Sequence, residues 1–432
     1  MMVEPILESS QPLAVAMDSM NGSGRRFCLV THENRIVGVI SDGDLRRYLR
    51  AGGSVNDRAE KAMVTEFFWL TPESEPQDVH KALRQYTFVP ILDSYGGLVY
   101  VATHERPHRI PLAEPFMDHS EETRLMECFQ SGWISSRSPF VKEFEEGFAA
   151  YVGANDGLCV SNGTVAIELA LRALGIGPND EVIVPDLTFG ATANAVLNVG
   201  ATPRLADITD DDWGIDPSQL DNCLTPRTRA VIVVHLYGAP ARLNDIRKWC
   251  DSHELKLIED CAEAIGSRID GRHVGTVGDA GTFSFFANKT ITTGEGGFVT
   301  FRSGEHTEVA KLIRDHGLSA GSGEHYWHEV QGGNLRMTGL QAAIGLAQLE
   351  KIRDITDAKR RLASQFSELL PKDSPLTIRG DLRNDVNSHW LIVGEMSDGF
   401  SKKRLELQQH LGMLGIETRL GFQPLHRMPA FA

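Results

Sequence analysis

The most constraining feature of the sequence is an alternation of short apolar runs with helical patterns, which begins near residue 157. The apolar runs are GLCVS, EVIVP, RAVIVVH and LKLIED, and the patterns after the first three are TVAIELALRAL, ATANAVLNVG and LNDIRKWCDSH. Such runs are too uniformly apolar for an antiparallel sheet with one face in solvent. Their alternation with helices predicts an α/β fold, with a mostly parallel sheet covered on both faces.

The regions before and after this core have different sequence patterns from it. Residues 1–105 contain short strand-like runs and helices, which predict an α+β module, and the prolines within 106–115 mark a linker because proline disfavours helix. We expect the α/β core over 116–345. A long amphipathic pattern from about Thr338 to Leu370 leads into the tail, and 346–432 is expected to form a small α+β C-terminal domain.

Composition excludes several classes of protein. The chain has 432 residues, of which 41% are hydrophobic and 23% charged, so disordered and fibrous architectures are excluded. A formal net charge of −15 argues against nucleic-acid and anionic-membrane partners, although local donors can still hold one phosphate. The six scattered cysteines predict reduced thiols. Without a signal-peptide pattern or a run of roughly 18 apolar residues, the sequence predicts a cytoplasmic protein.

Polar residues follow the predicted strands, and ligands bind at the carboxyl ends of strands in an open parallel sheet. Gly163 and Thr164 open a helix, where free N–H groups, a hydroxyl and the helix dipole suit a phosphate. The alternative is that Thr164 only caps its helix. Asp260 ends LKLIED, where its carboxylate either pairs with a cationic ring nitrogen or caps the next helix.

Two further residues complete this candidate site. Lys289 lies between aromatic residues and a glycine-rich run in DAGTFSFFANKTITTGEGG, five residues after Ser284. Partial desolvation would lower the pKa of its amine and make it a Schiff-base nucleophile, whereas the alternative is a solvated surface lysine. Phe189, just past EVIVP, is either a core aromatic or a ring that stacks on a planar cofactor. We predict no metal site.

Seven sequence blocks together resemble one family. They are SGWISSRSPFVKEFEEGFAAYVGA, SNGTVAIELAL, PDLTFGATANAV, EDCAEAIGS, SFFANKTITTGEGG, NLRMTGLQAAIGLAQLE and PLHRMPAF. Their order is that of the DegT/DnrJ/EryC1/StrS family of pyridoxal-phosphate-dependent sugar aminotransferases. The resemblance extends from about Ile110 to the end and implies a fold-type-I, aspartate-aminotransferase-like transferase. SFFANKTITTGEGG looks most like the perosamine synthase branch.

The resemblance implies a role for each candidate residue. Lys289 would bind pyridoxal 5'-phosphate covalently and later move a proton, while Asp260 would keep the pyridine nitrogen protonated. Asn334 resembles the residue that reaches the phosphate in a neighbouring subunit, which implies a homodimer with shared active sites. Arg336 and His426 resemble positions near the nucleotide-sugar substrate. The further residues implied to contact the cofactor are Gly163, Thr164, Phe189 and Ser284.

The sequence departs from the family pattern at three places. Glu263 stands where Gln is frequent beside the ring hydroxyl, and an ionised carboxylate there would repel a phenolate. Leu335 replaces the aromatic residue usual between Asn334 and Arg336. The sequence stops at Ala432, where relatives usually continue, so we expect either a truncated small domain or a site that closes differently.

The N-terminal region resembles a second family, the cystathionine-β-synthase (CBS) modules. VGVISDGDLRRYL contains the spacing of Gly38, Ser41 and Asp44 that is typical of these modules, and a second, incomplete half follows around KAMVTEFFWLTPESE to GLVYVAT. The resemblance predicts a CBS tandem in which Ser41 and Asp44 contact an adenine nucleotide. The alternative is that these two side chains only start and cap a helix.

The combined resemblance predicts an enzyme that aminates C4 of a nucleotide-linked 4-keto-6-deoxy sugar, with L-glutamate as amino donor, for polysaccharide or related glycan biosynthesis. A C3-aminating enzyme and a non-catalytic nucleotide-sensing regulatory protein are the alternatives. A sugar dehydratase is disfavoured, because relatives that eliminate carry histidine in place of the lysine at Lys289. The nucleotide and the stereochemistry of the sugar depend on a few pocket contacts.

Overall fold

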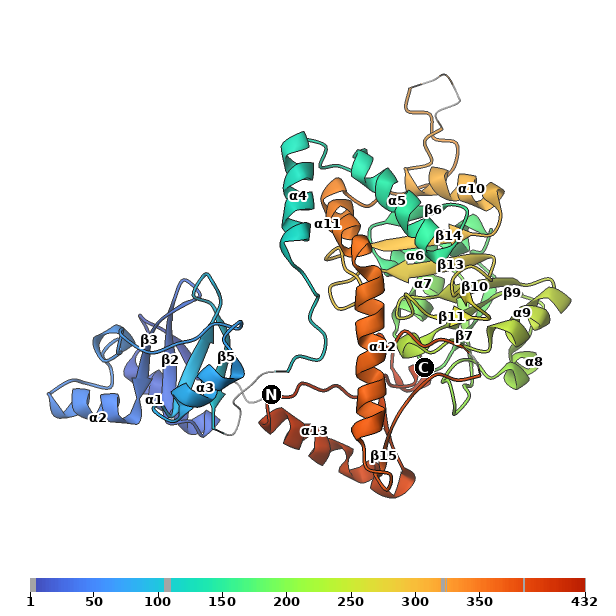
Figure 1. Ribbon diagram of the computed structural model, residues 1–432. Helices are drawn as coiled ribbons and strands as arrows, with labels where there is room; N and C mark the ends of the chain where they lie inside the picture. The colour runs from blue at the N-terminus through green and yellow to red at the C-terminus, as the bar shows by residue number, and fades with distance from the viewer. Residues whose placement is uncertain (1–4, 105–109, 320–322, 324, 384, 432) are drawn as a thin grey trace. The chain divides into compact units, whose positions relative to one another are not determined.

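The computed structural model describes residues 5–104, 110–319, 323, 325–383 and 385–431 (Figure 1). The chain forms two compact units. The N-terminal unit comprises Met1–Leu112 and Lys402–Arg419, and the core unit comprises Ala113–Ser401 and Leu420–Ala432. No helix in the described parts of the chain is long and apolar enough to cross a membrane.

The N-terminal unit is an α+β structure built around a three-stranded sheet and a separate hairpin. Its elements are β1 (Ile6–Glu8), α1 (Leu13–Ser23), β2 (Phe27–His32), β3 (Arg35–Ser41), α2 (Asp42–Arg50), η1 (Ala59–Lys61), α3 (Pro76–Leu83), β4 (Phe88–Leu92), β5 (Leu98–Thr103) and α13 (Arg404–Met413). β1 pairs parallel with β2, β2 and β3 are antiparallel, and β4 and β5 form the hairpin. Phe27 stacks on Phe88 with ring centroids 3.9 Å apart, so the hairpin packs on the sheet.

The core unit contains a seven-stranded sheet that confirms the predicted α/β class. In spatial order its strands are β6 (Gly157–Val160), β14 (Gly297–Phe301), β13 (Ala280–Ser284), β10 (Lys256–Asp260), β9 (Thr228–Val234), β7 (Glu181–Pro185) and β8 (Thr202–Ala206). β14 runs antiparallel to both of its neighbours, and all the other strands point the same way. The carboxyl ends of six strands therefore meet at one edge of the sheet.

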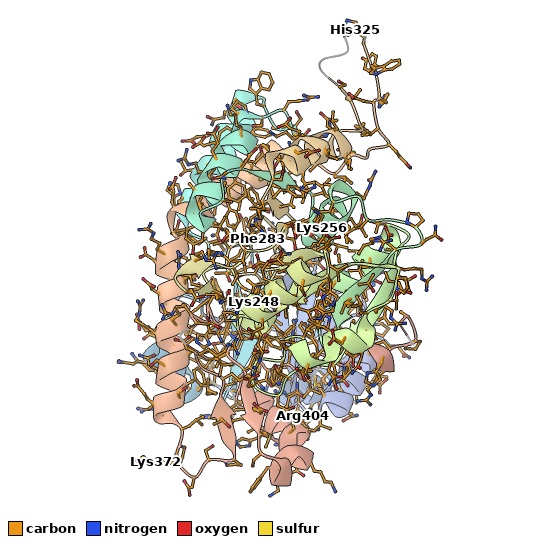
Figure 2. All side chains as sticks on the ribbon, turned by 90° about the vertical axis from the view of Figure 1, so that its right-hand side faces the viewer. Lys248, Lys256, Phe283, His325, Lys372 and Arg404 are labelled. Atoms are coloured by element: carbon orange, nitrogen blue, oxygen red, sulfur yellow. The ribbon has the colours of Figure 1, made fainter. Side chains whose placement is uncertain are left out.

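Helices cover both faces of this sheet. Successive side chains of a strand point to opposite faces, so each apolar strand contacts helices on both sides. In β9, Val231 and Val233 face one hydrophobic cluster, while Ala230 and Ile232 face the other. The first cluster includes α5 (Pro139–Val152), α9 (Leu243–Ser252) and α11 (Gly339–Glu350), and the second includes α6 (Gly163–Ala173), α7 (Ala191–Asn198) and α10 (Gly304–Arg314). Figure 2 labels Phe283, which is 1% exposed in the first cluster.

The long amphipathic pattern forms two helices rather than one. α11 begins with a capping box between Thr338 and Gln341 and ends before Lys351, after which α12 (Ile352–Leu369) continues. The remaining elements are α4 (His119–Ser131), η2 (Pro217–Gln219), α8 (Leu220–Cys223), η3 (Leu236–Gly238), β11 (Arg268–Ile269), β12 (Arg272–His273), β15 (Leu376–Ile378), β16 (Gly394–Met396), η4 (Asp398–Lys403) and η5 (Leu425–Arg427). The division at residue 345 into a large and a small domain stays a prediction.

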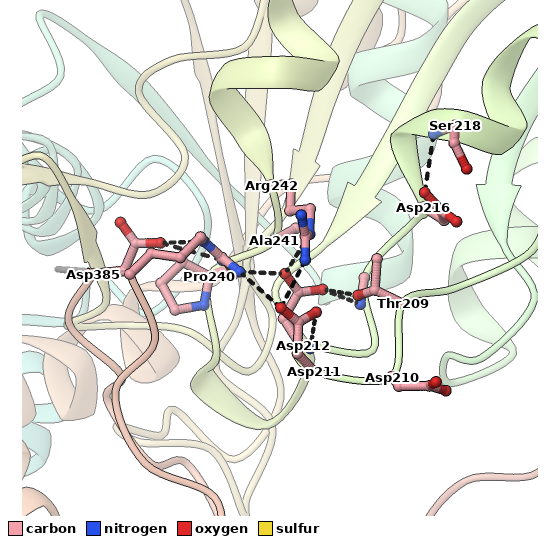
Figure 3. Close-up of polar contacts among 12 residues, drawn as sticks. Thr209, Asp210, Asp211, Asp212, Asp216, Ser218, Pro240, Ala241, Arg242 and Asp385 are labelled. Carbon is pink, nitrogen blue, oxygen red and sulfur yellow. Dashed lines mark hydrogen bonds and ion pairs between the residues drawn. The ribbon is translucent and has the colours of Figure 1, made fainter.

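A network of charges ties the segment after α12 to the parallel sheet (Figure 3). The carboxylate of Asp212 is buried; it accepts hydrogen bonds from Thr209 Oγ1 and from the Gly214 N–H at 2.6 and 2.8 Å. Arg383 donates to Asp212 Oδ2 at 2.7 Å, and Arg242 Nε lies 3.6 Å from the same oxygen. A buried carboxylate held by two guanidinium groups is stable only while both cations are present.

We therefore expect Asp212→Ala to destabilise the core unit. It would remove the buried anion nearest to Arg383 and leave Thr209 Oγ1 and the Gly214 N–H without their acceptor, at a cost of about 2–3 kcal/mol, since Asp211 still contacts both guanidinium groups. Urea unfolding followed by circular dichroism measures the change. Asp210→Ala is the matched control, because Figure 3 shows the exposed Asp210 side chain pointing away from the cluster. An equal loss of stability in both variants would contradict the prediction.

Candidate active site

The predicted site residues of the core unit gather mainly at the edge of the sheet where the strands end. Gly163 follows β6, Phe189 follows β7, Asp260 ends β10, and Lys289 follows β13. Because these strands run parallel, segments that are more than a hundred residues apart in the chain meet at one edge of the sheet. This is the place where an open α/β sheet binds ligands.

A tight turn at the start of α6 forms one side of the site. Asn162 caps the helix by accepting the N–H of Val165 at 2.9 Å, which leaves the first N–H groups of the helix directed outward. A Cβ at Gly163 would lie 2.8 Å from Cβ of Ser284, so glycine is required for the end of β13 to pack here. The structure thus brings Gly163, Thr164 and Ser284 together, in an arrangement that could hold a phosphate.

Asp260 is a buried carboxylate at the carboxyl end of β10. Its Oδ2 accepts the hydroxyl of Thr192 at 2.8 Å, and its Oδ1 accepts the N–H of Ala262 at 3.1 Å. Burial raises the pKa of Asp260, while these hydrogen bonds and the charge of Lys289 act in the opposite direction. A cationic ring nitrogen beside the carboxylate would offset the cost of its burial.

Lys289 is not a solvated surface lysine. Its side chain is 12% exposed, and its Nζ lies 3.7 Å from Glu263 Oε1 and 4.1 Å from the ring centroid of Trp390. Burial lowers the pKa of Lys289, and the nearby carboxylates Glu263 and Asp260 counteract that shift. An amine held in this way is closer to its uncharged, nucleophilic form than an exposed lysine is.

Glu263 is the carboxylate nearest to this amine. Burial raises the pKa of Glu263 to about 7, and its Oε2 accepts the N–H of Tyr237 at 2.9 Å. The sequence raised a conflict between an ionised Glu263 and a phenolate. A pKa near neutrality removes much of that conflict, because the protonated acid can donate a hydrogen bond instead of repelling an anion.

A pocket of about 440 Å³ opens beside these groups. Its lining residues are Thr164, Thr188, Phe189, Gly190, Ala191, Asn194, Phe422 and Met428. The ring of Phe189 is 62% exposed, and its centroid lies 5.9 Å from that of Phe422. An exposed ring at a strand end favours the stacking role over the core role that was its alternative.

The remaining predicted residues lie on two segments at the margins of the site. Asn334 is exposed, and its Oδ1 accepts a hydrogen bond from Arg336 Nε at 3.0 Å; Arg336 also pairs with Asp315 and bridges to Val160 at the edge of β6. His426 pairs with Asp186, which follows β7, through Nδ1 at 2.5 Å. These residues are thus placed near strand ends, and their contacts with substrate or with a second subunit stay predictions.

Ser41 and Asp44 lie in the N-terminal unit. They form a capping box at the start of α2, in which each accepts a hydrogen bond from the backbone N–H of the other, and Asp44 also pairs with Arg47. The alternative interpretation of these residues, as a helix start, accounts for both side chains. Their contact with a nucleotide stays a prediction.

A row of aromatic residues along the site is not predicted from the sequence. Trp390 stacks on Tyr237 with an interplanar angle of 9°, and Tyr237 stacks on Phe422 at 16°. The hydroxyl of Tyr237 accepts the N–H of Phe422 at 3.0 Å. A Tyr-Gly pair three residues past the end of β9 was the available signal for Tyr237, whereas nothing local distinguishes Trp390 or Phe422 from core residues.

A buried His235–Glu259–Cys261 group has the composition of a metal site. Glu259 already accepts the backbone N–H groups of Gly275, Val277 and Gly278 at 2.6–2.8 Å and lies 3.2 Å from His235 Nε2. His235 Nδ1 accepts the N–H of Ala241 at 3.1 Å, which makes Nε2 the donor to Glu259. These hydrogen bonds give the group a structural role without a metal ion.

Donor chemistry at the strand ends fits pyridoxal phosphate. The outward N–H groups at the start of α6 match a phosphate, and the buried acid Asp260 matches a ring nitrogen. The amine of Lys289 matches an aldehyde, and the exposed ring of Phe189 matches a planar ring. Each of these partners lies within the core unit. The residues present therefore fit this cofactor.

Comparison with known proteins agrees with this chemistry. The model of the DegT/DnrJ/EryC1/StrS aminotransferase family matches residues 115–432, and the CBS domain model matches residues 1–51. The chain is 40% identical over 325 residues to GDP-perosamine synthase of Caulobacter vibrioides, covering 75% of this chain and 87% of the relative. It is 43% identical over 230 residues to UDP-N-acetyl-3-dehydro-alpha-D-glucosamine 3-aminotransferase of Acidithiobacillus ferrooxidans, covering 53% and 61%.

Solved structures confirm the fold-type-I architecture. The PLP form of the putative sugar aminotransferase Spr1654 from Streptococcus pneumoniae superposes with a TM-score of 0.69 at 27% identity, covering 75% of this chain and 87% of that one. The N-terminal match likewise confirms a CBS domain. The chain therefore belongs to the DegT/DnrJ/EryC1/StrS aminotransferase family and is a pyridoxal-phosphate-dependent aminotransferase.

Proposed function

We propose that this enzyme transfers the amino group of L-glutamate to C4 of a nucleotide-linked 4-keto-6-deoxy sugar. The observation that carries the proposal is the buried amine of Lys289, 3.7 Å from Glu263 at the strand ends, in a chain 40% identical to a GDP-perosamine synthase. The amino sugar would supply a polysaccharide or a related glycan. Free cysteines and a nucleotide-sugar substrate are consistent with a cytoplasmic enzyme.

Lys289 and Asp260 would act as the catalytic residues. When bound, pyridoxal phosphate supplies an aldehyde and a ring that takes up electrons. The amine of Lys289 would bind that aldehyde and, once released, carry a proton to and from the reacting carbon. Asp260 would stabilise a protonated ring nitrogen, since its buried carboxylate otherwise lacks a full counter-charge.

The groups around these two residues would bind and orient the cofactor. Gly163, Thr164 and Ser284 would hold the phosphate through the start of α6, and Phe189 would stack on the ring. Glu263, with a pKa of about 7, would lie beside the ring hydroxyl and accept a proton from the amine or return it. These roles rest on the packing of Ser284 against Gly163 and on the contact between Glu263 and Lys289.

The substrate would enter through the pocket that Phe189 and Phe422 line. Its apolar rim suits a deoxy sugar, while Arg336 and His426 would contact the nucleotide end. Both side chains already pair with a carboxylate, Asp315 and Asp186 respectively, so an incoming diphosphate would compete with an existing anion.

We also propose a homodimer with shared active sites. The N-terminal part of the core unit exposes five large apolar side chains, Phe116, Met117, Phe129, Trp133 and Ile134, which are 44–63% exposed. Large apolar side chains that stay in solvent are typical of a protein interface where they form a patch. Asn334 is exposed as well, as a residue that reaches a neighbouring subunit has to be.

Two other functions are favoured by single observations. The 43% identity to a 3-aminotransferase over 230 residues favours amination at C3. The CBS match over residues 1–51 favours a nucleotide sensor that binds an adenine nucleotide at the N-terminal unit, with or without catalysis by the core unit.

Turnover distinguishes these functions. We expect the purified chain to convert a GDP-linked 4-keto-6-deoxy sugar and L-glutamate to an amino sugar and 2-oxoglutarate, with NMR of the product assigning the nitrogen to C4. Lys289→Ala should lower the rate by about 10²- to 10⁴-fold or more, because it removes both the amine and the proton carrier. Lys248→Ala, on the exposed side of α9, is the matched control (Figure 2). Nitrogen at C3, or nucleotide binding without turnover, would contradict the proposal.

Glu263→Gln should change the dependence of stability on pH. The pKa of Glu263 rises from its ordinary value of 4.5 to about 7 in the folded chain, so the folded state retains a proton that the unfolded state loses. The free energy of unfolding should therefore fall by roughly 2–3 kcal/mol as the pH rises from 4.5 to 7, relative to the variant.

Urea unfolding of the full-length chain, stripped of bound aldehyde, measures this difference at several pH values. Glu143→Gln is the control, because Glu143 is exposed on α5. Parallel curves for wild type and Glu263→Gln between pH 4.5 and 7 would show that Glu263 ionises normally.

The proposed dimer is tested by charging its apolar surface. Replacing both Phe129 and Trp133 with Asp should weaken dimerisation by about 30-fold or more, as loss of large buried side chains from an interface does. Sedimentation velocity over a range of concentrations gives the dissociation constant. Leu369→Asp, at the 83% exposed end of α12, is the control. A wild-type chain that sediments as a monomer would refute the dimer.

A further inference from the structure

Trp390 contacts the reactive lysine in two ways. The centroid of its ring lies 4.1 Å from Lys289 Nζ, and its indole N–H donates to the carbonyl oxygen of Asn288 at 2.7 Å. One side chain therefore touches both the amine and the peptide that precedes the lysine. Trp390 is 5% exposed, so solvent does not compete for either contact.

Contacts from two distant elements hold Trp390 in place. Its carbonyl oxygen accepts a hydrogen bond at 3.0 Å from Lys359 of α12, and burial lowers the pKa of Lys359. Its ring stacks on Tyr237, which has a φ of 54° at the turn after β9. A left-handed backbone at an aromatic residue costs free energy and persists only where packing imposes it. The indole is therefore clamped rather than free to rotate.

Opposing influences act on the amine of Lys289 at this place. Burial favours the uncharged amine, while the carboxylates of Glu263 and Asp260 favour the ammonium ion. The face of an indole ring carries negative charge density and attracts a cation by about 0.5–2 kcal/mol. Trp390 thus offers the ammonium ion support that does not depend on the protonation of Glu263.

We propose that Trp390 is a positioning residue for Lys289. Its N–H fixes the loop through Asn288, and its ring face holds the free amine, which also contacts Glu263. The inference rests on the proposed role of Lys289 as the reactive amine. The positioning role concerns only the amine, however. It can be absent in a chain that transaminates, and it can be present in a chain that does not transaminate.

The test measures the amine without turnover. The full-length chain is treated with hydroxylamine to release any bound aldehyde and dialysed, and then labelled with trace acetic anhydride between pH 6 and 11. Mass spectrometry of the peptide that contains Lys289 gives the pKa and the intrinsic reactivity of this amine. Hydrogen exchange of the segment 285–292 reports on the loop.

Trp390→Leu removes both contacts, and Trp390→Phe removes only the N–H. In the Leu variant we expect the pKa of Lys289 to fall by about half a unit to one unit, because the ring face no longer stabilises the ammonium ion. In the Phe variant the pKa should stay within about 0.3 units of wild type. Exchange in 285–292 should rise about fivefold to tenfold in both, because the hydrogen bond to Asn288 is lost.

Trp249→Leu is the matched control, since the indole of Trp249 also donates a hydrogen bond, to Asp221 at 2.8 Å, but lies on α9 against His253. It should leave both readouts at wild-type values. An unchanged or raised pKa in Trp390→Leu, or a pKa in Trp390→Phe as low as in the Leu variant, would overturn the contact through the ring. Should the Leu variant not fold, wild-type exchange of 285–292 in Trp390→Phe would still overturn the positioning role.

Discussion

Desolvation of ionisable groups at one edge of the sheet is the constraint on which this structure depends. Asp260 and Glu263 are buried and Lys289 is largely buried, and burial shifts the pKa of each group in the direction that favours its uncharged form. Each group needs partners that limit this cost, and the partners define the site: Thr192 for Asp260, Tyr237 N–H for Glu263, and Trp390 for Lys289. Such opposing influences keep an amine and an acid near the point where they can exchange a proton.

The pleat of a single strand gives two neighbouring carboxylates different surroundings. Glu259 and Asp260 are adjacent in β10, so their side chains point to opposite faces. Glu259 accepts three backbone N–H groups from residues 275–278 and a hydrogen bond from His235, which fixes the loop that leads into β13. Asp260 faces the site. Two carboxylates one residue apart therefore do different work because their surroundings differ.

Local patterns were sufficient where short-range physics decides. Alternating apolar runs and helices predicted the α/β sheet. Gly163, Phe189, Asp260 and Lys289 all lie at strand ends, as predicted, and their roles stay predictions. The same reasoning left Ser41 and Asp44 open between a nucleotide contact and a helix cap; the capping box shows the cap, and the nucleotide contact stays a prediction. The break between α11 and α12 at Lys351 was not visible in the continuous amphipathic pattern.

The sequence by itself determined the class of fold, the family and the residue types of the site, because strand direction and helix starts follow from local periodicity and capping. Only the tertiary structure decided the environment of the amine. Trp390 is 101 residues from Lys289 in the chain. Tyr237 precedes Lys289 in the sequence and Phe422 follows Trp390, so no local pattern connects these residues. The protonation of Glu263 and Lys289 depends on distances and burial, and these exist only once the chain has closed around them.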